Sequence, residues 1–557
     1  MLYAITLSLG GTELYNEVYN PEQIEYINYL RENPLNINTA SLDELQRLPY
    51  ITPILAKRII KHRPYKHFED FISKTKIPEE IWEAILPYIT ILPTPKSPLP
   101  SKGRIVSLCY TTLPKDSITL ISQQYRAKAE IESDYYALLF QTEHDPNEPN
   151  IVDFYSLSLE LKLKPLRIIL GDYDIDRGEG LLFSSYHYFV SATENIKHPD
   201  RGITKYSTVF ENGGFRGASA EIQINTISIF AFTHNTYRDG KQKADTSDYQ
   251  LYDEGLHVSE QELANKDIIN ERGIGGGAEW NHPKAKIGAT AYYSLWNPPI
   301  EHVEDSTLWA SVWGNIEDNN RGIFWETSIT STLEYAGIIG TYISTKYTGL
   351  RCAFFHYSHN YYSPYGKSLS LFEGQGETGI SSVAWIKGRG IKTTYHLAYS
   401  TSQQDVEWYS AGNIYTRVFA PAEIDAGFSL HNTRSTSKFV IRYTSRGYKL
   451  GIELRSPFPN NTGGLVALNL RFQKGIHKLT AKSSFFSIDG YDSRVYIYEP
   501  NLPWKLSIYP VWGTGMRTRL CYTISIGSAK VYASFFYQWK KDTEDRYEFG
   551  VMTDVHW

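Results

Sequence analysis

Apolar and polar residues alternate with a period of two along most of the chain. Residues 157–163 alternate strictly between Leu and polar side chains, and residues 466–473 repeat the pattern. Short turns such as Lys164-Pro165 and Lys474-Gly475 separate such segments. Alternation interrupted by tight turns is typical of antiparallel strands joined as hairpins. The sequence therefore predicts a mainly β protein over residues 104–557.

The polar face of these strands favours a membrane barrel over a soluble sandwich, because it carries charges in mid-strand while the other face is rich in Leu, Ile, Phe and Tyr. The charged positions are Glu160, Lys162, Arg442, Lys449 and Glu453. Long polar excursions at residues 238–271 and 360–374 alternate with short turns, as outer loops and periplasmic turns do. We therefore expect a large antiparallel transmembrane β-barrel of roughly 22–26 strands, with lipid outside and a wet lumen inside.

A helical period replaces the alternation near the amino end. Apolar residues recur every three or four positions over residues 13–31, Pro53 is placed to open another helix, and Phe68 and Pro78 begin two more. We therefore expect a small all-α domain over residues 12–92.

The segments that flank this domain have their own composition. Residues 93–103 are rich in proline, which favours an extended, semi-rigid linker to the barrel at 104–557. Residues 1–11 form a short apolar run with no basic residue before it. We interpret this run as the remnant of a signal peptide, and a buried strand or helix end is the alternative.

Composition narrows the class of protein further. The 557 residues carry 56 Lys and Arg against 61 Asp and Glu, a net charge of −5, with a mean hydropathy of −0.37. No stretch approaches the roughly 20 consecutive apolar residues of a membrane helix, so a helical membrane bundle is excluded. The near balance of charge argues against a protein that coats nucleic acid over its whole surface. Cys109, Cys352 and Cys521 are too few and too separated for a disulfide framework, and each is interpreted as a packed thiol.

Several segments of the helical region carry a family resemblance. They are Leu35-Asn36-Ile37-Asn38-Thr39-Ala40, Leu45-Gln46-Arg47-Leu48-Pro49, Ala56-Lys57-Arg58-Ile59-Ile60, Phe68-Glu69-Asp70-Phe71 and Ile85-Leu86-Pro87-Tyr88-Ile89. Residues 35–92 thereby resemble the helix-hairpin-helix domain of competence-type DNA receptors. The resemblance implies a tandem of helical hairpins and raises DNA as a partner.

The phosphate-binding turns of that family are altered in this chain. A Gly-apolar-Gly turn lets backbone N–H groups cradle a phosphate, whereas the second turn here is Lys76-Ile77-Pro78 and the first holds no glycine either. Side chains crowd such an approach, and Pro78 has no N–H. Nearby basic residues could still attract a phosphate backbone, with a solvated helix face as the alternative. The candidate phosphate or DNA contacts are Tyr50, Ile51, Thr52, Lys57, Arg58, Lys61, Arg63 and Lys66.

The final strand is the sharpest single signal. Tyr547, Phe549, Val551, Val555 and Trp557 share one face of an alternating segment that ends on an aromatic residue. This resembles the carboxy-terminal insertion signal of bacterial outer-membrane barrels. An ordinary edge strand is the alternative.

The combination of a helical domain with a barrel resembles a family of Bacteroidetes-type outer-membrane proteins. Further segments that carry this resemblance are Leu170-Gly171-Asp172-Tyr173, Gly178-Glu179-Gly180-Leu181, Phe215-Arg216-Gly217-Ala218, Gly255-Leu256-His257 and Glu262-Leu263-Ala264. We expect the last to be a short loop helix with Ser259 and Glu262 as its capping box. The resemblance implies a bacterial outer-membrane location with the helical domain in the periplasm, and it brings no established activity.

Candidate catalytic and cofactor sites are weak. Asp172, Asp174, Asp176 and Glu179 could bind a hard cation, but the run lacks the bidentate Glu of a calcium loop, so lumen-facing polar residues are the favoured interpretation. Residues 273–278 match Gly-x-Gly-x-x-Ala, yet strand-like sequence follows instead of a helix, and we interpret them as a flexible turn. No serine-hydrolase elbow, zinc-protease motif or phosphate loop occurs. We expect no catalytic residue, no metal or other cofactor, and no enzymatic activity.

Two function classes remain. The first is a non-enzymatic outer-membrane barrel for transport, capture or envelope assembly, with the helical domain as a periplasmic docking module or plug. The second is an outer-membrane receptor that binds DNA during uptake through the helix-hairpin-helix domain, and the missing turn glycines favour the first. The expected partners are outer-membrane lipid, the barrel-assembly machinery and periplasmic proteins, with DNA added in the second class.

Overall fold

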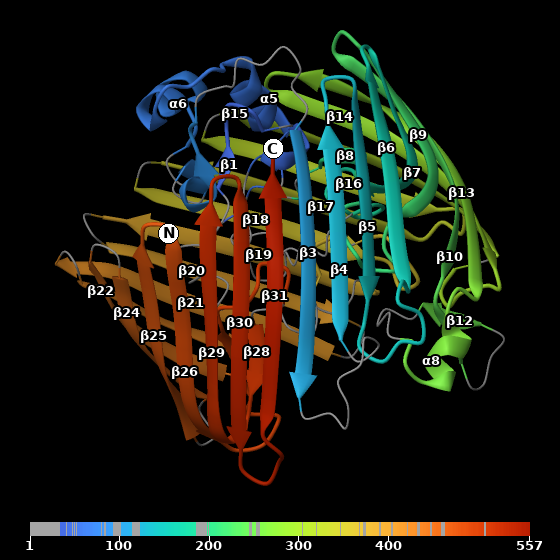
Figure 1. The fold of residues 1–557 in the computed structure, drawn as a ribbon. Helices are drawn as coiled ribbons and strands as arrows, with labels where there is room; N and C mark the ends of the chain where they lie inside the picture. The colour runs from blue at the N-terminus through green and yellow to red at the C-terminus, as the bar shows by residue number, and fades with distance from the viewer. Residues whose placement is uncertain are drawn as a thin grey trace.

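The computed structural model places a small helical domain at one end of a large β-barrel (Figure 1). It describes residue 30, residues 34–92 except 41, 47, 49–50, 52, 79–80 and 83–84, and residues 102–557 except 114–122, 185–197, 199, 244–247, 252–256, 304, 319, 346, 367, 371–374, 389–390, 403–404, 420–421, 432–434, 446–447, 458–462 and 506–507. The expected signal-peptide remnant lies outside the described residues. Among the helices that are described, none has the length and apolar character needed to cross a bilayer.

The helical domain is built from short elements around its own core. Its described elements are β1 (Leu35–Asn36), α4 (Leu42–Gln46), α5 (Pro53–Lys61), α6 (Phe68–Thr75), η1 (Leu86–Tyr88) and β2 (Ile89–Thr90). Strands β1 and β2 pair in parallel and bring the two ends of the domain together. The core includes Leu45, Ile59, Phe71 and Tyr88, each fully buried. The predicted helix starts at Pro53 and Phe68 are confirmed.

Helix α6 shows how the second hairpin turn forms without glycine. The ring of His67 accepts a hydrogen bond from the Asp70 backbone N–H at the start of the helix. At its end Lys76 adopts the left-handed conformation, with φ 50°, and its N–H donates to the carbonyl of Ile72. This conformation normally favours glycine, so the hairpin geometry is retained although the residue type has changed.

The barrel wall has 24 antiparallel strands, which confirms the predicted fold class and the even number. The first half of the wall consists of β3 (Lys102–Leu113), β4 (Gln124–Glu132), β5 (Tyr136–His144), β6 (Phe154–Leu163), β7 (Leu166–Asp176), β9 (Phe215–Ile224), β10 (Ile227–Arg238), β13 (Ile269–His282), β14 (Ala285–Asn297), β15 (Ser306–Asp318), β16 (Arg321–Thr330) and β17 (Tyr335–Ser344). The second half consists of β18 (Thr348–Tyr357), β19 (Glu377–Lys387), β20 (Ile391–Ser402), β21 (Asp405–Phe419), β22 (Ala422–His431), β23 (Ser435–Ser445), β24 (Tyr448–Pro457), β25 (Gly463–Lys474), β26 (His477–Ile488), β29 (Gly513–Ile526), β30 (Ala529–Lys540) and β31 (Arg546–His556).

Strand β31 closes the barrel, because it pairs with β30 on one side and with β3 on the other. Phe549, Val551 and Trp557 are exposed on the outer face, while Glu548 and Asp554 are buried on the inner face. The alternation expected for the terminal strand is therefore present. Its role as an insertion signal remains a prediction.

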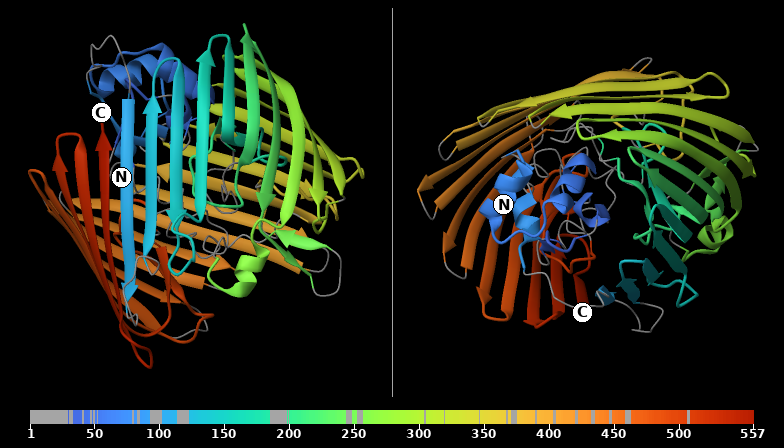
Figure 2. Two further views of the ribbon diagram at one scale, coloured as in Figure 1. Left: turned by 45° about the vertical axis from the view of Figure 1, so that its right-hand side comes forward. Right: turned by 90° about the horizontal axis from the view of Figure 1, so that it is seen from above.

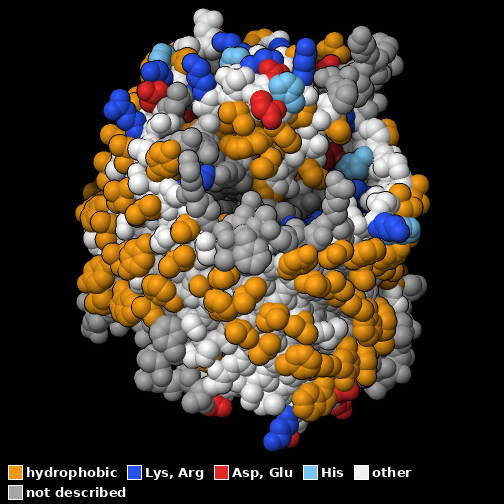
Figure 3. All heavy atoms as spheres, turned by 90° about the vertical axis from the view of Figure 1, so that its left-hand side faces the viewer, with side chains coloured by type: hydrophobic (Ala, Val, Ile, Leu, Met, Phe, Trp, Pro, Cys, Tyr) orange, Lys and Arg blue, Asp and Glu red, His pale blue; other side chains and the backbone are white. Residues whose placement is uncertain are grey.

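The wall turns its apolar face outward. Large apolar side chains are exposed along nearly every strand, and Figure 3 shows them spread over the wall. Of the charged mid-strand residues, Glu160 and Glu453 are buried inside, and Lys162, Arg442 and Lys449 are half-buried. An apolar belt around a closed sheet satisfies the backbone internally and suits contact with lipid.

The two ends of the barrel differ in the length of their connections. At the end that carries the helical domain, consecutive strands are joined by two or three residues, as between β25 and β26 or between β17 and β18. The opposite end carries the long connections, including the 238–269 segment with β11 (Gly240–Gln242), β12 (Tyr249–Leu251) and α8 (Glu260–Asn265). The capping box predicted for Ser259 and Glu262 is present at the start of α8.

Parts of these long connections fold back into the lumen. They include β8 (Gly202–Lys205), which pairs with the inner end of β7, residues 361–366 with Leu369, and the hairpin of β27 (Val495–Tyr498) with β28 (Ile508–Val511). We call the described residues of 177–205, from the end of β7 to the end of β8, the inserted segment. Aromatic residues of the wall, such as Phe232, Tyr292 and Trp309, pack with its Phe183. The expectation of a simply wet lumen is therefore wrong for this sector. Inserted chain segments bury apolar side chains there, which period-two alternation cannot reveal.

The glycine-rich run at residues 273–278 is part of β13 and not a flexible turn as expected. Every residue of the run pairs with β10 on one side and with β14 on the other. Rings of Phe232 and Tyr292 lie against its glycines. The absence of side chains makes room for these rings in the middle of the sheet.

Candidate functional site: a charged chamber beneath the helical domain

A cavity of about 1460 Å³ lies between the helical domain and the barrel lumen, and we call it the chamber. Seen from above, the helical domain lies within the outline of the barrel mouth (Figure 2). Its contribution to the chamber includes Asn38, Lys57, Ile60 and Arg63. The barrel supplies the other walls through residues of β3 to β9, of β13, β14, β30 and β31, and of the inserted segment that follows β7.

The chamber lining is basic. Fourteen Lys and Arg side chains line it against eight Asp and Glu, although acidic residues predominate in the whole chain. The basic residues are Lys57, Arg63, Lys102, Arg104, Arg126, Lys128, Lys162, Lys164, Arg167, Arg177, Arg201, Lys205, Lys286 and Lys530. Charges of one sign in a concave site raise the local concentration of oppositely charged solutes.

The inserted segment begins where β7 leaves the wall. Strand β7 pairs with β6 as far as Gly171, whose φ is 92°, and then continues inward to pair with β8. A β-carbon at Gly171 would lie 2.1 Å from the carbonyl oxygen of Leu157, so only glycine permits this close crossing. The segment Leu170-Gly171-Asp172-Tyr173 therefore marks the point at which the chain enters the lumen.

Glu326 on β16 holds the tip of this segment. Its Oε2 accepts hydrogen bonds from the backbone N–H of Glu179, at 2.7 Å, and from that of Leu181, at 3.0 Å. Its Oε1 accepts from the Ser311 hydroxyl at 2.6 Å. A buried carboxylate thus satisfies two backbone donors that would otherwise lack partners in the lumen.

A network of ion pairs fixes the floor of the chamber. Arg177 pairs with Glu279, and Lys286 lies 2.7 Å from Asp200 and 3.1 Å from Glu279. On the neighbouring side Arg201 lies 2.7 Å from Asp176. All of these side chains are nearly inaccessible to solvent. Buried charges of this kind require partners, so the network holds the inserted segment against β13 and β14.

The acidic run identified in the sequence belongs to the same network. Asp172 pairs with Arg216 at 2.7 Å, Asp176 pairs with Arg201, and Glu179 accepts from the His198 backbone N–H at 2.8 Å. Asp174 is buried beside them. The structure therefore places these four residues inside the lumen and supplies them with protein partners, as the favoured interpretation expected.

The structure separates the basic residues that were grouped as candidate phosphate contacts. Lys57 faces the chamber, and its Nζ donates to Oδ1 of Asn281 at the rim of the barrel, 3.3 Å away. Arg63 also lines the chamber and donates to the carbonyl of Ala40, whereas Arg58 donates to the carbonyl of Thr75 within the domain. Lys61 and Lys66 are exposed away from the chamber lining.

The first hairpin turn adds little to a phosphate site in the described part of the chain. Ile51 is buried in the core of the domain, while Tyr50 and Thr52 lie outside the described residues. Burial lowers the pKa of Lys57, and the nearby charge of Lys286 lowers it further. The sequence grouped five basic side chains by proximity, but docking against the barrel directs only two of them into one cavity.

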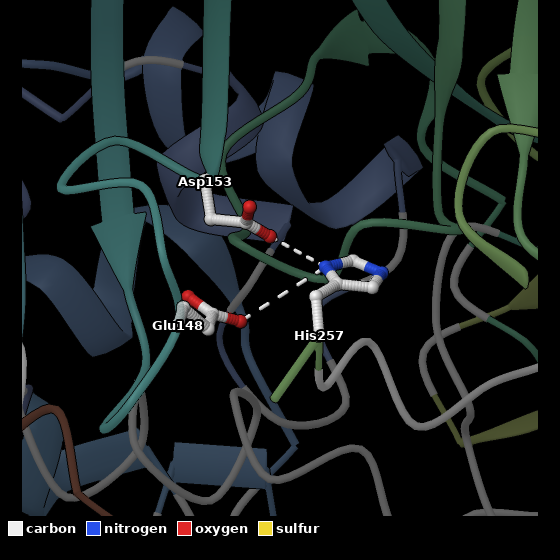
Figure 4. Close-up of side chains that lie close together, drawn as sticks. All are labelled: Glu148, Asp153 and His257. Atoms are coloured by element: carbon white, nitrogen blue, oxygen red, sulfur yellow. Dashed lines mark hydrogen bonds and ion pairs between the residues drawn. The ribbon is translucent and has the colours of Figure 1, made fainter. Parts of the chain in front are cut away.

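A second cluster of titratable groups closes the loops at the opposite end (Figure 4). His257 lies between Asp153, 2.5 Å from Nδ1, and Asp239, 3.0 Å from Nε2. Lys266 also contacts Asp153 at 2.5 Å, and Glu211 lies 3.4 Å from Nδ1 of His257. Burial alone would lower the pKa of His257, but hydrogen bonds to the two aspartates raise it to about 10. Burial raises the pKa of Glu211 to about 8.

The ion pairs around His257 hold these loops together, and we call this cluster the loop clasp. Ligand atoms of Glu148, Asp153 and His257 are close enough to share an ion, but a protonated imidazole and Lys266 already stand among the carboxylates. The sequence singled out His257 but not its partners, because Asp153 and Glu211 come from two other connections and Asp239 lies 18 residues away. No local spacing connects them.

Comparison with known proteins identifies the helical domain and gives distant similarities for the barrel. Residues 31–90 match the family described as helix-hairpin-helix motif, and no curated protein matches the chain. The P pilus usher PapC translocation pore is 8% identical over 82% of this chain and 99% of that one, with a TM-score of 0.37. The ferric enterobactin receptor PfeA of Pseudomonas aeruginosa is 7% identical over 82% and 80%, with a TM-score of 0.41. The FrpB iron transporter of Neisseria meningitidis is 8% identical over 82% and 81%, with a TM-score of 0.34.

Proposed function

We propose that this protein is a gated outer-membrane barrel in which the helix-hairpin-helix domain is a displaceable plug at the periplasmic mouth. The observation that carries the proposal is the seating of the domain. It lies across one mouth of a closed barrel, lines the chamber together with the lumen, and contacts the rim through Lys57 and Asn281. A solute or polymer that crosses the barrel must pass the domain, so its movement would control passage.

The orientation follows from the connections between strands. Outer-membrane barrels have short periplasmic turns and long extracellular loops. The helical domain lies at the end with two- and three-residue turns, which supports a periplasmic location for it. Its exposed surface would then meet periplasmic proteins, the outer wall would contact lipid, and the barrel-assembly machinery would insert the chain.

The plug contacts the barrel through exposed side chains. Polar contacts across the boundary include that of Lys57 with Asn281 and that of Lys102 with the carbonyl of Thr39, and both lysines are exposed. By contrast, the inserted segment beneath is held by buried ion pairs. This difference supports motion of the domain as a unit over a fixed lumen.

Reversible cross-linking tests the gate. Lys57→Cys and Asn281→Cys would be combined in a chain whose three native cysteines are replaced by serine, and joined by a reducible bifunctional thiol reagent. We expect low ion conductance in planar bilayers while the link is intact and a rise when it is reduced, with Lys57→Cys alone unaffected by the reagent. Equal conductance in the linked and reduced states would exclude the domain as the gate.

The helix-hairpin-helix match keeps DNA uptake as the second candidate. The structure gives it limited support, because Lys57 and Arg63 face the chamber and Arg58 is engaged within the domain. We expect duplex DNA to bind the full chain only nonspecifically, with a Kd of about 10⁻⁴–10⁻⁶ M at physiological salt. Much tighter binding that weakens steeply with salt would make DNA uptake the leading function.

A further inference from the structure

We propose that the chamber is a binding site for a small multivalent oxyanion, held between the helical domain and the lumen. The inference rests on the proposed function, since it names the class of solute that would occupy the path beneath the plug. Three features support it: the excess of cations, buried donors without acceptors among the described residues, and two lysines of the lining whose charges repel each other.

The excess of cations is local. Fourteen Lys and Arg side chains line the chamber with eight carboxylates, and three further carboxylates outside the lining, Asp554, Glu143 and Asp176, pair with Arg104, Arg126 and Arg201. Eleven carboxylates against fourteen cations leave the chamber a positive charge within a protein whose net charge is −5. Low-dielectric walls strengthen the field in such a cavity. An anion with several charges would gain more from this field than a monovalent one.

Arginine side chains in the lining keep donors that the protein does not use. Arg177 is almost fully buried and stacks on the ring of Phe230, with Nη1 engaged by Glu279. Its Nε and Nη2 have no hydrogen-bond acceptor among the described residues, and Nη2 lies 3.8 Å from Glu221, beyond hydrogen-bond distance. Arg63 likewise leaves Nε buried without an acceptor in the described part of the chain. Guanidinium groups match the geometry of phosphate and carboxylate oxygens, so the oxygens of a bound oxyanion would accept hydrogen bonds from these N–H donors.

Lys57 and Lys286 supply the third feature. Lys57 reaches into the chamber from α5, and its charge is repelled by that of Lys286 on β14. Lys286 is nearly fully buried and is held by Asp200 and Glu279. An oxyanion between the two domains would turn this repulsion into a bridge, which would couple occupancy of the chamber to closure of the plug.

The size of the chamber limits the ligand. Sites of roughly 300–1,000 Å³ accommodate ordinary small ligands, so about 1460 Å³ suits a small oligoanion and not a double helix. The oxyanion groups could be phosphates or carboxylates. The lining recognises what the two share, namely several negatively charged oxygens on one small molecule.

Calorimetry on the full chain in detergent micelles tests the site. The probes are tripolyphosphate, citrate and orthophosphate, titrated into wild type, Lys57→Gln and Lys61→Gln. Lys61 lies one helical turn from Lys57 on α5 but does not line the chamber, so it is the matched control. We expect at least one multivalent probe to bind more tightly than orthophosphate, with a roughly tenfold loss in Lys57→Gln and no change in Lys61→Gln.

The pattern of results decides the proposal and the source of the oxyanion. Preference for tripolyphosphate assigns phosphate, and preference for citrate assigns carboxylate. Absence of binding, or an equal loss in both variants, would overturn the site. If Lys57→Gln disturbs folding, the same titrations are made with Lys530→Gln, which removes a cation at another edge of the chamber and should also weaken binding. Calorimetry tests the oxyanion site and does not depend on ion conductance, which tests the gate. Either proposal can therefore fail while the other stands.

Discussion

Gly103 and Trp557 exchange backbone hydrogen bonds, N–H to carbonyl in both directions at 3.0 Å, and the indole of Trp557 lies directly over Gly103. A β-carbon at Gly103 would stand 2.0 Å from Cζ2 of the indole. The glycine and the aromatic residue sit at the seam where β3 meets β31. The terminal Trp therefore packs in space that the first wall strand leaves open.

Gly103→Val and Trp557→Ala should both reduce barrel assembly, because each removes the packing at the seam. We expect a similar loss of the compact, heat-modifiable form in the membrane fraction for each variant. The double variant should lose little more than either single one, since residues that share one contact are not additive. Additive losses would show that the two residues act separately, and full assembly of Trp557→Ala would show that this residue is not needed as an insertion signal.

Glu453 should be needed for the stability of its sector of the lumen. It lies 2.6 Å from Nε of Arg455 and 2.7 Å from Nζ of Lys482, and all three side chains are buried. Glu453→Ala would leave two buried cations without their carboxylate, and loss of one partner from a buried pair costs about 3–5 kcal/mol. The measurement is urea unfolding in lipid vesicles, with Glu544→Ala in an exposed loop as control. A change below about 1 kcal/mol would contradict the importance of this carboxylate.

Much of this architecture could be predicted from the sequence, because a barrel wall repeats one rule. Alternation placed Glu160 and Glu453 inside, and the turn lengths separated the two ends. The lumen could not be predicted in the same way. Phe232 and Tyr292 lie on the inner face, and Phe183 returns from another part of the chain to cover them, a contact that no local pattern predicts.

The residues that line the chamber could not be predicted from the sequence either. Lys57, Arg63 and Arg177 come from the helical domain and an inserted segment, and the docking of the two brings them together. Local spacing placed Lys57 beside Lys61 on α5 but could not tell which of them faces the barrel. Long-range packing, which leaves no periodic signal, decides that question.

The loop clasp around His257 should open at alkaline pH. The pKa of His257 is raised from its ordinary 6.5 to about 10, so its stabilisation is present below pH 6.5 and is lost as the pH rises through 10. The pKa of Glu211 is raised to about 8, so folding favours its neutral form and that contribution is lost as the pH rises through 8. The Glu211 shift therefore weakens the clasp between about pH 4.5 and 8, and the His257 shift weakens it between about pH 6.5 and 10.

A spin label on Val258→Cys, in a chain whose native cysteines are replaced, would report this opening. Val258 is exposed and adjoins His257, so the label should disturb little. We expect the mobile fraction of the label to increase severalfold from pH 7 to pH 10 in wild-type background. His257→Gln should be mobile at every pH, because an amide cannot form the charged pairs with Asp153 and Asp239. An equal pH response in His257→Gln would place the switch elsewhere.

The inserted segment should be released by removing two hydroxyls from the loop that follows β18. Tyr361 donates to the carbonyl of Leu181 at 3.0 Å, and Ser363 donates to the carbonyl of Leu182 at 2.8 Å. Tyr361→Phe with Ser363→Ala would leave both buried carbonyls without these donors, at a cost of about 1–3 kcal/mol for each. Because the same segment carries Arg177 into the chamber, its loosening should raise the basal ion conductance of the barrel severalfold while the wall still assembles. The measurement is single-channel recording, with Tyr347→Phe at an exposed turn as the matched control. Unchanged conductance in the double variant, with intact heat-modifiable migration, would show that the segment is held by its ion pairs alone.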